Sequence, residues 1–179
     1  AMNAATAVAA VEIFAERAGR AVPEAAVRAG LAAARCPARM EYFPGVPPLL
    51  LDGAHNPVSI RALRELIDTV FARKPVVLLM GVARDKDTDT MLQEIVPRAR
   101  CVVFTRSDNP RAADPEALCA QCRTIAPIPC EAEPDAFRAL DRARDLAASD
   151  ALLCVTGSLY LAGKLRPVLA PQEYAPTQP

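Results

Sequence analysis

Short apolar runs alternate with amphipathic segments along most of this chain, and this alternation constrains the fold more than any other feature of the sequence. The apolar runs predict strands at residues 49–51, 76–80, 101–105, 128–130 and 151–155. The amphipathic segments predict helices at residues 57–71, 88–96, 115–123, 134–148 and 159–169. Strands that lack polar alternation are typical of a parallel sheet buried on both faces. The pattern therefore predicts an α/β fold with a mostly parallel sheet and helices on both faces.

The beginning of the chain does not follow this pattern. Apolar residues at helical spacing predict two helices, at residues 3–19 and 23–34. An alternating run at 39–43 predicts an edge strand, and the Pro-rich stretch at 44–48 marks a boundary. We therefore expect a helical segment at residues 1–36, a three-layer Rossmann-like domain at 37–170 and a flexible tail at 171–179.

Composition argues against two classes of function. The 21 lysines and arginines balance the 21 acidic residues, so no net charge favours binding to nucleic acid or to an anionic membrane surface. No apolar run approaches the roughly 18 residues of a membrane-spanning helix.

Cys119 and Cys122 have CxxC spacing, but they lie in a predicted helix without a second paired motif, which favours a structural role. Scattered cysteines are typical of a reduced chain, so we expect a cytoplasmic protein.

Polar residues follow the predicted strands at the points where the next helices begin. They lie at residues 52–56, 81–87, 106–111 and 156–158. In an open parallel sheet these turns share the carboxyl edge, which is where ligands bind. We therefore expect Asp52, His55 and Ser158 to lie close together.

The turn after the first buried strand has two interpretations. Asn56 as a cap and Pro57 at the first helical position are typical of a helix start. That interpretation does not account for Asp52 and His55, the single histidine of the sequence. On local grounds a ligand contact and a purely structural turn remain equally open.

The other turns give weaker signals. Residues 156–158 offer backbone N–H groups and a hydroxyl to an anion, although serine is also a common helix cap. Residues 107–111 are typical of a turn that contains proline, and residues 84–87 of a solvated loop. No GxxxxGK[ST] or GxGxxG motif occurs in the sequence, so any ATP site here would be incomplete.

Taken together, these segments resemble the C-terminal domain of the folylpolyglutamate synthase and dihydrofolate synthase family, relatives of the Mur ligases. The resemblance covers about residues 3–170. It rests on LDGAHNP at 51–57, Gly81 with DKD at 85–87, SDNPR at 107–111, VTGSLY at 155–160, NAATA at 3–7 and PARME at 37–41. Two departures are Ala38, where the family usually has glycine, and Cys36, where it often has an aromatic residue.

The resemblance implies an ATP-dependent ligase that adds L-glutamate to dihydropteroate or to the terminal glutamate of a folate, through an acyl phosphate. Members of the family begin with a larger ATPase domain that holds the P-loop and the Mg²⁺ ligands. We therefore expect the helices of residues 1–36 to be the remaining end of that ATPase domain. We also expect this chain to work with such a domain in cis, to act as a monomer and to be inactive alone. The alternative is a stand-alone α/β module that binds a nucleotide or metabolite without catalysis.

The resemblance also implies roles for individual residues. The expected ATP contacts are Asn3, Arg39 and Asp52. The expected catalytic residues, on the phosphate and glutamate side, are His55 and Ser158. Weaker candidates for substrate binding are Lys86 and Tyr160. No metal ligand is expected on this chain.

Overall fold

The computed structural model describes residues 2–171. The chain divides into two compact units, with the division between Cys36 and Pro37. The first unit contains the two predicted helices, α1 (Met2–Arg17) and α2 (Glu24–Ala33), and Gly19 between them has a positive φ of 67°. Except for its first residue, the tail predicted at 171–179 lies outside the described residues.

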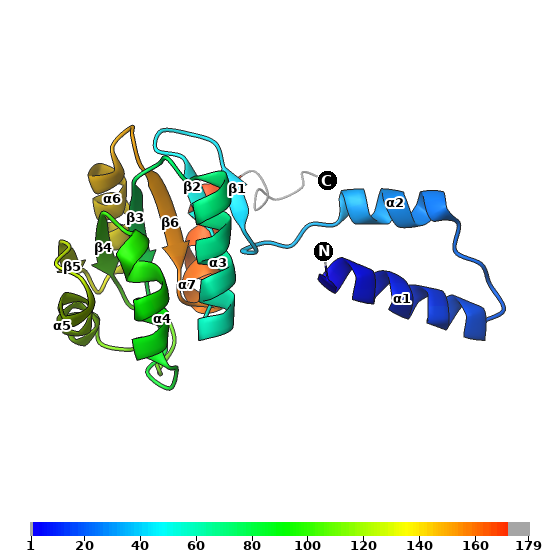
Figure 1. The fold of residues 1–179 in the computed structure, drawn as a ribbon, viewed down its shortest axis with the longest axis horizontal. Coiled ribbons are helices and arrows are strands. Elements are labelled where there is room, and N and C mark those ends of the chain that lie inside the picture. The colour runs from blue at the N-terminus through cyan, green and yellow to red at the C-terminus, as the bar shows by residue number, and fades with distance from the viewer. Residues whose placement is uncertain (1, 172–179) are drawn as a thin grey trace, which may run out of the picture. The chain divides into compact units, whose positions relative to one another are not determined.

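The second unit is built on a six-stranded sheet with the order β1-β2-β6-β3-β4-β5 (Figure 1). The strands are β1 (Glu41–Phe43), β2 (Leu49–Leu51), β3 (Val76–Met80), β4 (Cys101–Phe104), β5 (Cys130–Ala132) and β6 (Leu152–Thr156). The edge strand β1 pairs with β2 in the antiparallel sense, and every other pair is parallel. The last strand in the chain, β6, therefore lies between β2 and β3.

Helices cover both faces of this sheet (Figure 1). One face packs against α3 (Pro57–Val70), α4 (Thr88–Ile95) and α5 (Pro115–Ile125), and a short 3₁₀ helix η1 (Val96–Arg98) follows α4. The other face packs against α6 (Ala136–Ala147) and α7 (Leu159–Leu169). Alternate residues of a strand point to opposite faces, so Leu78 joins the first core and Leu79 the second. The predicted three-layer α/β fold is confirmed.

Local chemistry accounts for two boundaries that differ from the sequence prediction. The edge strand begins at Glu41 rather than at residue 39, because Ala38 and Met40 have positive φ values of 55° and 49°, which a strand does not accommodate. The strand predicted at residues 128–130 begins at Cys130 instead. Pro129 precedes it and has no N–H to donate to a neighbouring strand.

Candidate functional site

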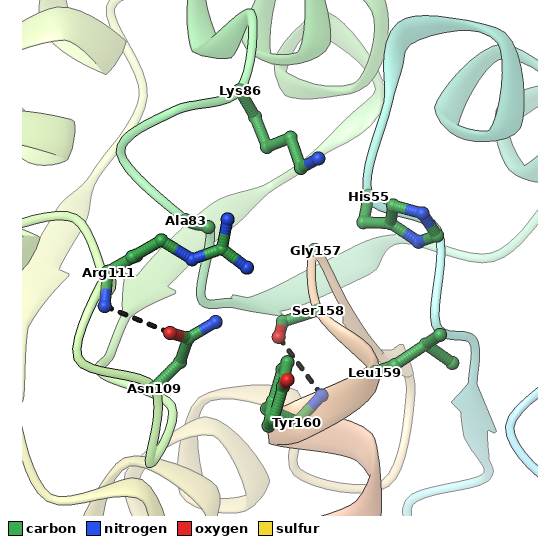
Figure 2. Close-up of a pocket in the computed structure, with 9 residues that line it drawn as sticks. All are labelled: His55, Ala83, Lys86, Asn109, Arg111, Gly157, Ser158, Leu159 and Tyr160. Atoms are coloured by element: carbon green, nitrogen blue, oxygen red, sulfur yellow. Dashed lines mark hydrogen bonds between the residues drawn. The ribbon is translucent and has the colours of Figure 1, made fainter.

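A pocket of about 190 Å³ lies at the carboxyl edge of the sheet. It is formed by the turns that follow β2, β3, β4 and β6. The lining residues are His55, Ala83, Lys86, Asn109, Arg111, Gly157, Ser158, Leu159 and Tyr160 (Figure 2). The expectation that His55 and Ser158 share one edge of the sheet is confirmed.

His55 presents one ring nitrogen to possible ligands. Its Nδ1 lies 2.8 Å from the carbonyl oxygen of Gly53, and because a carbonyl only accepts, Nδ1 carries the proton. The backbone N–H of His55 donates to Ser59 Oγ at 3.1 Å, which fixes the turn below the ring. In the neutral imidazole, Nε2 is therefore a proton acceptor, and it is the nitrogen left for chemistry.

The turn between β6 and α7 requires glycine. Gly157 has φ +99°, and a Cβ at this position would lie 2.7 Å from the carbonyl oxygen of Gly81. Ser158 follows it as the cap of α7, and its Oγ accepts from the N–H groups of Tyr160 at 3.1 Å and Leu161 at 3.4 Å. The first residues of α7 line the pocket, so the positive end of the helix dipole faces it.

Two cationic side chains extend toward the pocket from the neighbouring turns (Figure 2). Arg111 pairs with Asp85 at 2.8 Å, whereas Lys86 has no ion pair with a described residue. Asn109 accepts the backbone N–H of Arg111 through Oδ1 at 2.9 Å, which leaves its amide nitrogen as a donor. None of the nine lining residues is acidic. The pocket is therefore suited to a ligand with negative charge.

The turns after β3 and β4 are held together as a pair. The N–H of Arg84 donates to the carbonyl of Arg111 at 2.7 Å, and the N–H of Ala113 donates to the carbonyl of Val82 at 2.8 Å. These bonds place Arg111 and Asn109 beside Lys86. The sequence analysis named neither Asn109 nor Arg111 as a site residue. The position of the proline turn at 107–111, directly after a buried strand at the carboxyl edge, could have indicated both.

Asp52 and Arg39 form a second feature, outside the pocket lining. The carboxylate of Asp52 is buried, with Oδ1 accepting from the N–H of Ala54 at 2.8 Å and Oδ2 from the N–H of Met40 at 2.7 Å. These bonds hold the left-handed turn around the exposed Arg39, which has no ion pair with a described residue. Asp52 thus shapes the turn that carries Arg39.

The remaining predicted residues differ in exposure. Tyr160 lines the pocket and is 58% exposed. Asn3 is exposed on α1, in the first unit. Across residues 2–171 no group of three or more His, Cys, Asp and Glu side chains is placed to hold a metal ion. Within the same range no helix has the length and apolar character needed to cross a membrane.

Residues 38–159 match the family model described as Mur ligase, glutamate ligase domain. The chain belongs to this family. The match spans the strands and turns that form the pocket, from the Arg39 turn to the start of α7. The resemblance to the C-terminal domain of folylpolyglutamate and dihydrofolate synthases, stated from the motifs, is confirmed by this family and by the relatives described next.

Relatives of this glutamate ligase domain include the dihydrofolate synthase/folylpolyglutamate synthase of Mycobacterium tuberculosis, which is 34% identical over 92% of the chain and 37% of its own length. The structure of Mycobacterium tuberculosis folylpolyglutamate synthase complexed with ADP matches with a TM-score of 0.81 at 32% identity, over 91% of this chain and 38% of that one. E. coli FolC in complex with DHPP and ADP gives a TM-score of 0.82 at 25% identity, over 96% and 39%. This chain spans little more than a third of their length.

Proposed function

We propose that this chain is the glutamate-binding C-terminal part of an ATP-dependent ligase that joins L-glutamate to dihydropteroate or to a folate. The observation that carries the proposal is the pocket, where His55, Lys86 and Arg111 meet the start of α7 and no acidic residue lines the wall. A small dicarboxylic amino acid matches this distribution of charge. Membership of the glutamate ligase domain family supports the same ligand.

The polar side chains of the pocket bind different groups of such a ligand. Lys86 neutralises a carboxylate, while Arg111, which is paired with Asp85, and the Asn109 amide donate hydrogen bonds to it. His55 Nε2 accepts a proton from the ammonium group of glutamate, which converts it into the attacking amine. The amine then attacks the carbonyl carbon of the acyl phosphate, and the bond from that carbon to the phosphate oxygen breaks. The nitrogen gives its second proton to the departing phosphate, which leaves beside the positive end of α7.

The nucleotide requires residues beyond this pocket. Arg39 is the candidate for an ATP contact in the second unit, because it is exposed and its turn is fixed by Asp52. Asn3 is the corresponding candidate in the first unit. The sequence lacks a P-loop, so the residues that bind the ATP phosphates and Mg²⁺ belong to an ATPase domain in cis. The chain alone is then inactive.

The compartment and the oligomeric state belong to the same proposal. The six cysteines of the chain are free thiols, which agrees with a reducing cytoplasm. A monomer is sufficient, because the four turns that form the pocket come from a single chain.

The experiment is a titration of the chain with L-glutamate, followed by backbone amide NMR. We expect weak binding, with a Kd in the millimolar range, and shifts concentrated at residues 83–86, 109–111 and 157–160. Lys86→Ala should weaken binding about tenfold or more, because it removes a charge-assisted contact. Arg84→Ala is the matched control, since Arg84 is an exposed cation of the same turn that does not line the pocket.

Two results would contradict the proposal. Changes in amide chemical shift on addition of ATP, but not on addition of L-glutamate, would favour the stand-alone nucleotide-binding module. Equal loss of binding in Lys86→Ala and Arg84→Ala would show that overall charge, and not the pocket, attracts the ligand.

A further inference from the structure

Three cysteines away from the pocket meet between α5 and β5. Cys119 and Cys122 lie one turn apart on α5 and are fully buried, whereas Cys130 is the first residue of β5 and is half-buried. Cys130 Sγ lies 3.6 Å from the carbonyl oxygen of Cys119. Cys130 also lies close enough to Cys119 and Cys122 to contribute to the raised pKa of both thiols. One partly exposed cysteine therefore lies beside two fully buried ones.

The three thiols of the cluster differ in their access to solvent. None of the groups of potential ligands in residues 2–171 is arranged to hold a metal ion. Burial raises the pKa of Cys119 to about 12 and that of Cys122 to about 11, with a further contribution from the neighbouring Cys130. Both α5 thiols are therefore protonated at neutral pH. Reagents in solution reach Cys130 first, because it is the partly exposed member of the cluster.

We propose that Cys130 is an oxidation site, which forms a disulfide with one of the two α5 thiols when the protein meets a low-molecular-weight disulfide. In the first step the deprotonated Cys130 sulfur attacks one sulfur of the reagent, whose S–S bond breaks and releases one thiol. In the second step an α5 thiol loses its proton and attacks the Cys130 sulfur, which releases the second thiol. Two protein thiols are oxidised, and one reagent disulfide is reduced to two thiols.

The location of the cluster gives this disulfide a structural effect. β5 is an edge strand that pairs only with β4 in the sheet. A disulfide from Cys130 would attach this edge covalently to α5, across the short segment that contains Pro127 and Pro129. The reaction is independent of the proposed ligase function, since none of the three cysteines lines the pocket.

The experiment treats the folded chain with oxidised glutathione and analyses tryptic peptides without reduction. Cys36→Ser is used as the background, because Cys36 is exposed and would compete for the reagent. Trypsin cuts after Arg111, Arg123 and Arg138, so Cys119 and Cys122 fall in peptide 112–123 and Cys130 in peptide 124–138. We expect a linked species with the summed mass of both peptides less two hydrogens, which dithiothreitol reverses.

Two variants and one condition make the result decisive. Cys130→Ser should abolish the linked species, and Cys101→Ser, which changes a buried cysteine outside the cluster, should keep it. Unfolding in guanidinium before oxidation should lower the yield at least fivefold, because the fold brings the thiols together. Recovery of glutathione on Cys130 without any link, or of a Cys119–Cys122 disulfide within peptide 112–123, would overturn the proposal.

Discussion

His55 shows how one backbone contact determines which atom of a side chain is available. The Gly53 carbonyl occupies Nδ1, and the half-buried ring leaves Nε2 as its other polar atom. Asp52, three residues earlier, is the opposite case, because backbone N–H groups engage both of its carboxylate oxygens. Two titratable residues of one turn thus have different roles. His55 lines the pocket at the carboxyl edge of the sheet, and Asp52 holds the backbone of the turn.

Replacing His55 tests its role in a ligase that joins this chain to an ATPase domain, as proposed. We expect His55→Ala to lower turnover by about 10²–10⁴-fold, the usual contribution of a general base. The free energy of unfolding should fall by only about 1 kcal/mol, the value of one hydrogen bond. Turnover and thermal unfolding are measured on the same preparation.

Asn56→Ala is the control for this prediction. Asn56 Oδ1 accepts from the N–H of Ser59 at 2.9 Å and caps α3, so its loss should cost about 1 kcal/mol of stability. Turnover per folded molecule should stay unchanged. If His55→Ala behaves like Asn56→Ala in both measurements, His55 is a structural residue of the turn.

Two glycines near the start of α7 give a second test at single positions. We expect Gly157→Ala to destabilise the chain by about 2–4 kcal/mol, because its positive φ and the close Gly81 carbonyl both oppose a side chain. Gly163 lies inside α7 with open space around it, so Gly163→Ala should raise the free energy of unfolding by roughly 1 kcal/mol. Denaturant unfolding measures both. If Gly157→Ala and Gly163→Ala change the free energy of unfolding equally, the β6–α7 turn can accommodate a side chain at residue 157, contrary to this prediction.

Elements are joined across the sheet edge by an ion pair between β1 and α7. Arg166 on α7 donates to both carboxylate oxygens of Glu41 on β1, and the Arg166 side chain is 8% exposed. Glu41 also accepts the N–H of Ala38 at 2.8 Å. One carboxylate therefore links the left-handed turn, the edge strand and the last helix.

This ion pair predicts a dependence of stability on pH. The hydrogen bonds from Arg166 lower the pKa of Glu41 below 4.5 in the folded chain, so its stabilisation is present above about pH 4.5 and is lost as the pH falls through the folded-state pKa. Glu41→Gln should cost about 3 kcal/mol at pH 7, the low end for a buried pair. The difference from the unchanged chain should shrink in acid, as followed by denaturant unfolding at several pH values.

Asp150→Asn is the comparison for Glu41→Gln. Asp150 pairs with Arg100 at 2.8 Å, but its side chain is 59% exposed, so the loss should stay below about 1 kcal/mol. A penalty for Glu41→Gln that is equally small, or that does not change with pH, would contradict a stabilising role for the β1–α7 pair.

The elements were largely predictable from the sequence, and the exceptions have local causes. The buried strands β3 and β6 were predicted because each is a short apolar run of five residues followed by turn residues, too short for a buried helix. The start of β1 was missed because alanine and methionine do not themselves signal a positive φ, and the glycine that the family usually has at position 38 was not interpreted as such a signal. The pocket was half predicted. His55 and Ser158 stand out as a lone histidine and a helix cap, whereas the contribution of Arg111 depends on pairing between two distant turns.

At the scale of the whole molecule, the sequence contains no P-loop motif to bind the phosphates of a nucleotide. The isolated chain should therefore release no ADP from ATP in the presence of Mg²⁺, because the sequence has no P-loop. ATP should bind with a Kd in the millimolar range or weaker, since only base, ribose and single cationic contacts are available. Calorimetry and a coupled ADP assay check both points. Micromolar affinity would reveal a phosphate site that the sequence motifs do not show.

The position of β6 has a consequence for how the polypeptide acquires its structure during synthesis. β2 and β3 leave the ribosome before β6, but each needs β6 as a hydrogen-bonded neighbour, and β6 is the last of the six strands in chain order. Until residue 156 is free, the centre of the sheet lacks one strand and two apolar edges stay open. Chaperones that bind apolar strands therefore act on the nascent chain in the interval between the synthesis of β3 and that of β6.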